Sequence, residues 1–288
     1  MDKTLIDKIL SEVLAMEAED AKEAGALGFM ARAMVQATLP HSKPEELVFE
    51  RRNGAFSLAI MAHPRVGLPY GSIPRLLTAW ITTEAVRTKE PTLILGHTLS
   101  GFMEQLDMVP TGGRWGSITR LRDQMKRLFS SSISCLYEGN NNDVGFNIHL
   151  VDQYRLWWSP KEPDQAGLWQ STINLNQRFF DEVTTHPIPI DLRALKALKR
   201  SPLALDIYCW LTYRMSYLQR NTQIPWEALQ AQFGSDYENT RQGRYNFKMA
   251  FNKHLRSVMV VYHGVNVEVS DSSLLLKPSP THIRIAPK

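Results

Sequence analysis

The sequence has little cysteine and no long apolar run. Cys135 and Cys209 are its only cysteines, which excludes a four-thiolate metal site and a disulfide framework. The longest apolar stretch, from Ala55 to Ala62, is far shorter than the ~20 residues of a transmembrane helix. The first residues, Met1 to Thr4, do not begin a signal peptide. We therefore expect a soluble, cytoplasmic protein that does not contact a membrane.

Motifs for catalysis are also missing. There is no G-x-x-x-x-G-K-[ST] phosphate loop, and the eight histidines show no H-x-H or H-E-x-x-H spacing. The acidic residues are scattered or gathered near the N-terminus, whereas two-metal sites need clustered carboxylates. We expect no enzymatic activity, no catalytic residues, no metal and no cofactor. A rolling-circle nicking enzyme stays the less favoured alternative, because it needs paired histidines beside a tyrosine nucleophile.

Charge is distributed unevenly along the chain. The whole sequence has 33 basic and 29 acidic side chains, a net charge of +4. Residues 1–25 contain seven acidic and three basic side chains, a net charge of −4, so the remainder carries +8. A basic body with an acidic arm indicates a polyanionic partner. The role of the arm is open between masking the basic surface and contacting a host protein.

Hydrophobic periodicity predicts similar elements in both halves of the chain. Residues 1–38 are expected to be helical, and Phe56 to Ala62 to form a strand. The first half continues with a helix from Pro74 to about Lys89, a strand at Thr92–Leu95, a helix at Leu99–Leu106, a turn at Thr111–Gly113, a helix at Ser117–Phe129, and strands at Ile133–Tyr137, Gly145–Trp158 and Gly167–Leu175.

The second half repeats this order after Pro187 and Pro189. It contains a short helix capped by Asp191, a long helix opened by Pro202, a short helix from Pro225 to Gly234, a helix over about Asn239–Val261, and a hairpin of Val265–Val269 with Ser273–Lys277.

A helix, a short helix, a turn, a second helix and a hairpin, in this order, are typical of a winged helix. We predict an α+β fold with two tandem winged-helix domains and an N-terminal helical arm. The arm covers residues 1–45. The first winged-helix domain covers residues 46–185, and the second covers residues 186–288.

Two helices have the face that a major groove requires, with apolar residues on one side and cations and amides on the other. Helix 117–129 buries a stripe from Ile118 to Phe129 and offers Arg120, Lys126 and Arg127. Helix 239–261 contains no acidic residue. Its polar stripe consists of Arg241, Tyr245, Lys248 and Asn252, and Arg244 adds charge. A solvated basic face is the simpler interpretation of either helix alone.

Two other segments allow two interpretations each. The aromatic run Tyr154–Trp158 suits base stacking or, as we favour, packing in the core. Gln105–Val109 is similar to the peptide that docks on the bacterial sliding clamp, but it lacks the terminal aromatic. A structural turn is the favoured interpretation of that segment.

Several sequence blocks resemble the plasmid-encoded RepA replication-initiator family. The resemblance extends from about Glu50 to Tyr262. It rests on Leu68–Leu77 (LPYGSIPRLL), Ala79–Ala85 (AWITTEA) and Pro110–Gly116 (PTGGRWG), supported by Ser201–Tyr208 and Gln232–Tyr237.

The resemblance implies an initiator that binds direct repeats (iterons) in double-stranded DNA at a plasmid origin. Such proteins open an adjacent AT-rich stretch and recruit host helicase and initiator proteins. Their dimers, in equilibrium with monomers, repress the initiator's own gene and so affect copy control. The resemblance implies that the first winged-helix domain serves dimerisation and auxiliary DNA contact and that the second is the main DNA reader. It makes Arg241, Tyr245, Lys248 and Asn252 the main readers, with Arg120, Lys126 and Arg127 as supporting contacts. The alternative within the same fold is a transcriptional repressor.

Overall fold

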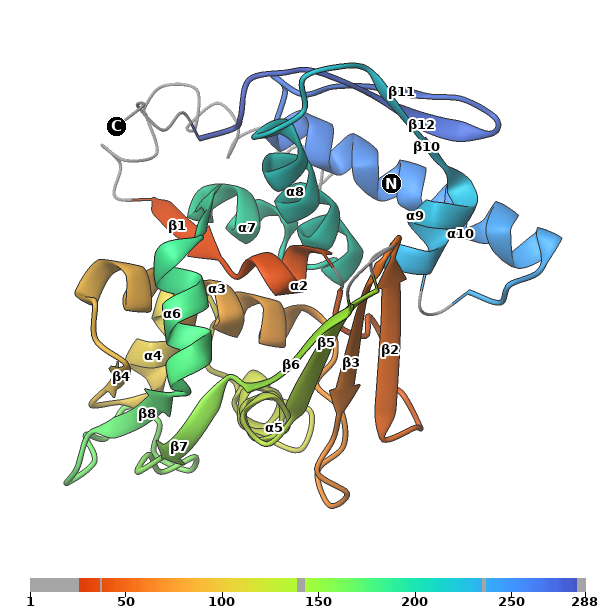
Figure 1. Cartoon of the computed structure of the whole chain (residues 1–288). Coiled ribbons are helices and arrows are strands. Elements are labelled where there is room, and N and C mark those ends of the chain that lie inside the picture. The colour runs from red at the N-terminus through yellow and green to blue at the C-terminus, as the bar shows by residue number, and fades with distance from the viewer. Residues whose placement is uncertain (1–25, 37, 139–142, 235–236, 284–288) are drawn as a thin grey trace.

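The structure is a computed structural model that describes residues 26–36, 38–138, 143–234 and 237–283 (Figure 1). It combines helices with antiparallel sheets, which confirms that the fold contains both kinds of secondary structure, as predicted. The helices are α2 (Arg32–Gln36), α3 (Ser72–Thr88), α4 (Leu99–Gln105), α5 (Ser117–Phe129), α6 (Gln177–Thr185), α7 (Leu192–Leu198), α8 (Pro202–Met215), α9 (Trp226–Phe233) and α10 (Arg241–Val261). No helix in these described ranges is both long and apolar enough to cross a bilayer.

The strands form four small sheets. These are, in spatial order, β1 (Leu27–Met30) with β9 (Ile188–Asp191); β2 (Val48–Asn53), β3 (Phe56–Met61), β5 (Ser132–Glu138) and β6 (Asp143–His149); β4 (Thr92–Gly96), β8 (Ser171–Leu175) and β7 (Val151–Arg155); and β10 (Thr222–Pro225), β12 (Ser273–Lys277) and β11 (Asn266–Val269).

One arrangement of elements occurs twice. The series α3-β4-α4-α5-β7-β8 matches α8-β10-α9-α10-β11-β12 in order. In both, the last strand lies between the other two, giving the sheets β4-β8-β7 and β10-β12-β11. The first copy differs by an insertion, because β5 and β6 follow α5 and join another sheet, in which β5 pairs with β3 and β6 pairs with β5. Each half therefore sets a long helix, α5 or α10, beside a three-stranded sheet.

Two apolar cores accompany these two units. In the first, the Trp80 and Phe102 rings meet edge to face at 5.0 Å. In the second, Phe233 and Phe251 meet at 5.6 Å and Trp226 packs on Phe251 at 5.8 Å. Tertiary packing of this kind supplies most of the stability of short helices.

The helix expected over residues 1–38 is wrong in its described part. Residues 27–30 form β1, which pairs with β9 so that Phe29 faces Pro189, and only α2 is helical. This pairing brings Gly28 so close to α7 that a Cβ at that position would lie 2.4 Å from Leu192 Cδ2. Long-range pairing has overridden local helix propensity. Residues 1–25 lie outside the described ranges.

The described part of the expected arm packs against both halves of the chain. Met30 and Val35 belong to the core of the second half, while Met34 and Leu39 belong to that of the first. The boundaries at residues 45 and 185 stay predictions.

Other differences from the expected elements have local causes. The strand expected over 145–158 is two strands, because β6 ends at His149 and β7 joins another sheet. Helix α6 was not predicted, although Asn176 caps it by accepting a hydrogen bond from Arg178 N at 3.2 Å. The short strands β2, β9 and β10 were also missed, since each is defined by its distant partner and not by its own pattern.

The aromatic run at residues 154–158 divides between core and surface. Trp158 is 7% exposed and stacks on Phe102 with ring centroids 5.2 Å apart. Tyr154 packs on Phe129 at 5.5 Å, whereas Trp157 is 52% exposed. Core packing, the favoured interpretation, is therefore confirmed for Trp158, and base stacking stays the less favoured alternative for the exposed Trp157.

Candidate nucleic-acid interface

Helix α10 is held by one buried stripe and a cap. Phe247, Phe251, Leu255 and Val258 are at most 1% exposed, as the periodicity predicts. Thr240 Oγ1 accepts a hydrogen bond from Gly243 N at 3.0 Å at the helix start. The opposite face of the helix is therefore directed away from the core.

Arg241 and Tyr245 lie on this outer face, one turn apart. Both are exposed, Tyr245 by 58%. Three neighbours that the sequence analysis did not name share the face: Gln242, Asn246 and Met249. Gln242 Nε2 donates to Asn246 Oδ1 at 2.9 Å. These residues stand one, five and eight positions after Arg241, on the side of the helix opposite Phe247. This spacing could have predicted from the sequence that they are exposed.

The other predicted readers of α10 contact the protein. Lys248 Nζ donates to the backbone oxygen of Asp271 at 3.0 Å and lies 5.5 Å from the Trp226 ring centroid. This contact joins α10 to the β11–β12 turn. Arg244 Nη1 donates to Glu227 Oε1 of α9 at 2.6 Å. Asn252 is half-buried, and its Oδ1 is buried without a hydrogen-bond partner in the described part of the chain.

The Arg244–Glu227 pair places an acid beside the predicted DNA-reading face. The pKa of Glu227 is lowered by the backbone N–H at the start of α9 and then by Arg244. We expect Glu227→Gln to release Arg244 and to raise affinity for any duplex by up to about fivefold at ~150 mM salt, the effect of one added phosphate contact. Anisotropy titrations against salt measure this. Glu90→Gln, at an exposed acid beyond α3, is the control, and equal affinities of the two variants contradict the prediction.

Helix α5 buries the predicted stripe and exposes two of its three predicted cations. Arg120 and Lys126 are exposed. The Arg127 side chain is only 13% exposed, and its Nε donates to Asp123 Oδ2 at 2.7 Å. Its Nη1 also donates to Leu68 O at 3.2 Å. In this arrangement Arg127 fixes the loop before α3 to α5, while Arg120 and Lys126 face solvent.

The segment that resembles a clamp-binding peptide forms the turn after α4. Gln105 Oε1 accepts a hydrogen bond from Trp80 Nε1 at 2.9 Å, and Leu106 is 5% exposed. Asp107 has a left-handed backbone, with φ of 53°. Two of the side chains that a clamp peptide would present are therefore engaged in the fold.

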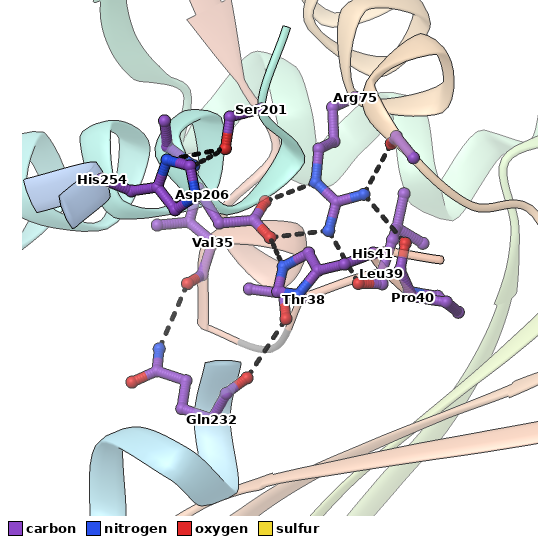
Figure 2. Close-up of polar contacts among 12 residues, drawn as sticks. Val35, Thr38, Leu39, Pro40, His41, Arg75, Ser201, Asp206, Gln232 and His254 are labelled. Carbon is purple, nitrogen blue, oxygen red and sulfur yellow. Dashed lines mark hydrogen bonds and ion pairs between the residues drawn. The ribbon is translucent and has the colours of Figure 1, made fainter. Parts of the chain in front are cut away.

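A buried ion pair joins the two halves (Figure 2). Arg75 of α3 donates from Nε to Asp206 Oδ1 at 2.7 Å and from Nη2 to Oδ2 at 2.6 Å; Asp206 belongs to α8. The remaining N–H groups of Arg75 donate to the carbonyl oxygens of Leu39, Pro40 and Gly71 at 2.7–3.1 Å. All five guanidinium donors are thus satisfied. We call Arg75, Asp206 and His41 the clasp, because His41 Nε2 also lies 2.8 Å from Asp206 Oδ2.

Contacts around the clasp extend it to α9 and α10. Thr38 Oγ1 donates to the backbone oxygen of Gln232 in α9 at 3.1 Å. Ser201, which caps α8, lies 3.1 Å from His254 Nδ1 of α10 through its Oγ (Figure 2). Burial lowers the pKa of His254. The clasp therefore holds segment 38–41, α3 and α8 together and, through them, fixes α10 relative to the first half.

Stability should fall in acid because of the clasp. Burial alone raises the pKa of Asp206, but Arg75 and His41 more than offset it and hold that pKa below its ordinary value. As pH falls through about 4, the Asp206 carboxyl takes up a proton in the unfolded chain before it does so in the folded protein. The clasp's contribution is thus complete above about pH 5 and declines toward the folded-state pKa. Urea unfolding from pH 7 to 3 should show a shallower acid loss for Asp206→Asn than for wild type, and equal slopes contradict this.

Comparison with known proteins provides the family. A family model described as plasmid encoded RepA protein matches residues 68–228, more than half of the chain. A search of curated proteins gives no match. The crystal structure of selenomethionine derivatives of RctB domains 2 and 3 matches with TM-score 0.55 and 12% identity, covering 85% of this chain and 98% of that one. A second structure of RctB domains 2–3 matches with TM-score 0.51 and 11% identity, covering 86% and 97%.

At 11–12% identity, the likeness to the RctB structures shows a similar fold and no more. The family is shown by the match to the sequence model. The sequence match includes the blocks from Leu68 to Gly116 on which the resemblance rests, contains Arg75 and Asp206 of the clasp, and ends in the first turn of α9. The chain belongs to the family of plasmid-encoded RepA proteins, which supports a role in replication initiation.

Proposed function

We propose that the protein is a non-catalytic plasmid initiator with two tandem winged-helix domains that bind repeated duplex sites at an origin. The observation that carries the proposal is the twofold occurrence of one unit, in which a long helix with an exposed basic face adjoins a sheet ordered β4-β8-β7 or β10-β12-β11. A helix of this kind fits the major groove, and a hairpin beside it reaches the adjoining backbone.

The two halves have different roles in this proposal. Helix α10 is the main reader, because Arg241 and Tyr245 are exposed beside the amides of Gln242 and Asn246. Arginine binds guanine bidentately, and amides bind adenine. Helix α5 presents Arg120 and Lys126, which suit phosphates.

Opening of DNA follows from binding energy alone in this mechanism. Several copies on adjacent repeats deform the duplex, and the cost of deformation is lowest in easily unstacked AT-rich steps. Host helicase and initiator proteins then gain access to the separated strands. The proposal includes a homodimer that binds the initiator's own promoter and a monomer that acts at the origin.

A footprint on the DNA flanking the gene tests the function. At ~150 mM salt with competitor DNA, nonspecific contacts are weak. Protection of several evenly spaced repeats, with permanganate-sensitive thymines beside them, is the expected result. Protection of a single inverted repeat over the promoter, with no protected direct repeats, indicates a repressor instead. Mg²⁺-dependent nicking that is lost in a Tyr→Phe variant indicates the enzyme, and no protection overturns the proposal.

A further inference from the structure

A groove of about 590 Å³ lies where the two halves meet. Its lining comes from four places: the start of α3, the α4–α5 turn and the outer face of α5 in the first half, and the α7–α8 turn in the second. Arg120 and Asp123 line it from α5, Asp107 from the α4–α5 turn, and Lys199 and Arg200 from the α7–α8 turn. The groove is thus lined both by the outer face of α5 and by the α7–α8 turn, which lies some eighty residues later in the sequence.

The α7–α8 turn is held in place by Asp107. Lys196 Nζ lies 3.0 Å from Asp107 Oδ1, and Lys199 forms an ion pair with Oδ2. Lys199 Nζ also donates to the backbone oxygen of Asp107 at 2.6 Å. Burial raises the pKa of Asp107, but the two lysines more than offset it and lower that pKa. These contacts, together with the clasp, position the next residue, Arg200, at the groove.

The charges that line the groove do not cancel. Asp107 is neutralised by the lysines, and Asp123 is paired with Arg127 at 2.7 Å. Arg120 and Arg200 are exposed, and neither forms an ion pair within the described ranges. Two uncompensated guanidinium groups, one from each half, therefore line a single groove. Guanidinium groups bind phosphate oxygens with planar, bidentate geometry.

We propose that the α7–α8 turn is a third DNA contact, in which Arg200 binds a backbone phosphate of the strand that Arg120 contacts. This rests on the proposed function, because the anion is taken to be the duplex that α5 faces. The occupant is a nucleic-acid backbone because the wall that holds Arg120 is the exposed basic face of α5. The contact bridges both halves, so duplex binding also stabilises their relative position.

A phosphate contact has a sequence-independent signature. Replacing Arg200 by glutamine should weaken binding about fivefold at ~150 mM salt, and equally for the origin repeat and a scrambled duplex. The slope of log K against log salt should decrease by about 0.9. Arg200→Lys keeps the charge and should retain most of the wild-type slope. Arg220→Gln, at an exposed arginine in the α8–β10 loop, is the matched control and should bind as wild type does.

The measurement is fluorescence anisotropy with the full chain and both duplexes at four salt concentrations, with a urea unfolding midpoint for each variant. If Arg200→Gln binds with the affinity and the salt dependence of the wild type, the α7–α8 contact is overturned. The initiator function then still stands if the wild-type protein gives the expected footprint. A loss confined to the origin repeat also overturns it, because that result indicates base reading. Failure of the wild-type chain to bind either duplex rejects the function and this contact together.

Discussion

Replacing Arg75 by alanine is expected to destabilise the folded protein by about 3–5 kcal/mol, the cost of leaving a buried charge without its partner. Arg75 is 4% and Asp206 9% exposed, so water does not take the place of the guanidinium. The carbonyl oxygens of Leu39, Pro40 and Gly71 lose their donors as well. Each buried acceptor that stays unsatisfied adds to the cost.

Urea unfolding monitored by tryptophan fluorescence measures this effect. Arg87→Ala is the matched control, because Arg87 lies on the same helix and pairs with Glu84 while 71% of its side chain is exposed. An exposed pair of this kind contributes about 0–1 kcal/mol. A loss for Arg75→Ala no larger than that for Arg87→Ala contradicts the view that the clasp holds the two halves together.

The clasp also shows where prediction from sequence ends. Helix α5 is found at Ser117–Phe129, as predicted, and α8 begins at Pro202. Both helices carry their own signals, an amphipathic period in one and a proline at the first position with a serine cap in the other. Arg75 and Asp206 are 131 residues apart. No local pattern relates them, and α3 is buried on nearly every side because it lies between the halves.

The candidate site divides in the same way. The buried stripe of α10 was predictable from a period of 3.6 residues, and it places Arg241 and Tyr245 outward. The ion pairs of Arg244 with Glu227 and of Lys248 with Asp271 were not predictable, because both acids lie on other elements of the chain. Counting charges within one helix overestimates how many of them face solvent.

Arg241→Ala is expected to weaken binding to the origin repeat by about 1–3 kcal/mol, roughly 5- to 150-fold, and to relax discrimination at one base pair. The reason is positional: Arg241 is exposed in the first turn of α10, and the N-terminal residues of a recognition helix contact base edges. Lys126→Ala, on the exposed face of α5, should instead weaken all duplexes alike because it removes a phosphate contact.

Competition binding with a set of repeats, each carrying one substituted base pair, separates these effects. For Arg241→Ala, the cognate repeat and the repeat altered at the contacted position should bind with nearly equal affinity, while other substitutions keep their cost. For Lys126→Ala, the whole series should shift together. If Arg241→Ala shifts the series uniformly, then Arg241 contacts a phosphate, and base reading passes to the exposed amides of Gln242 and Asn246 on the same face of α10.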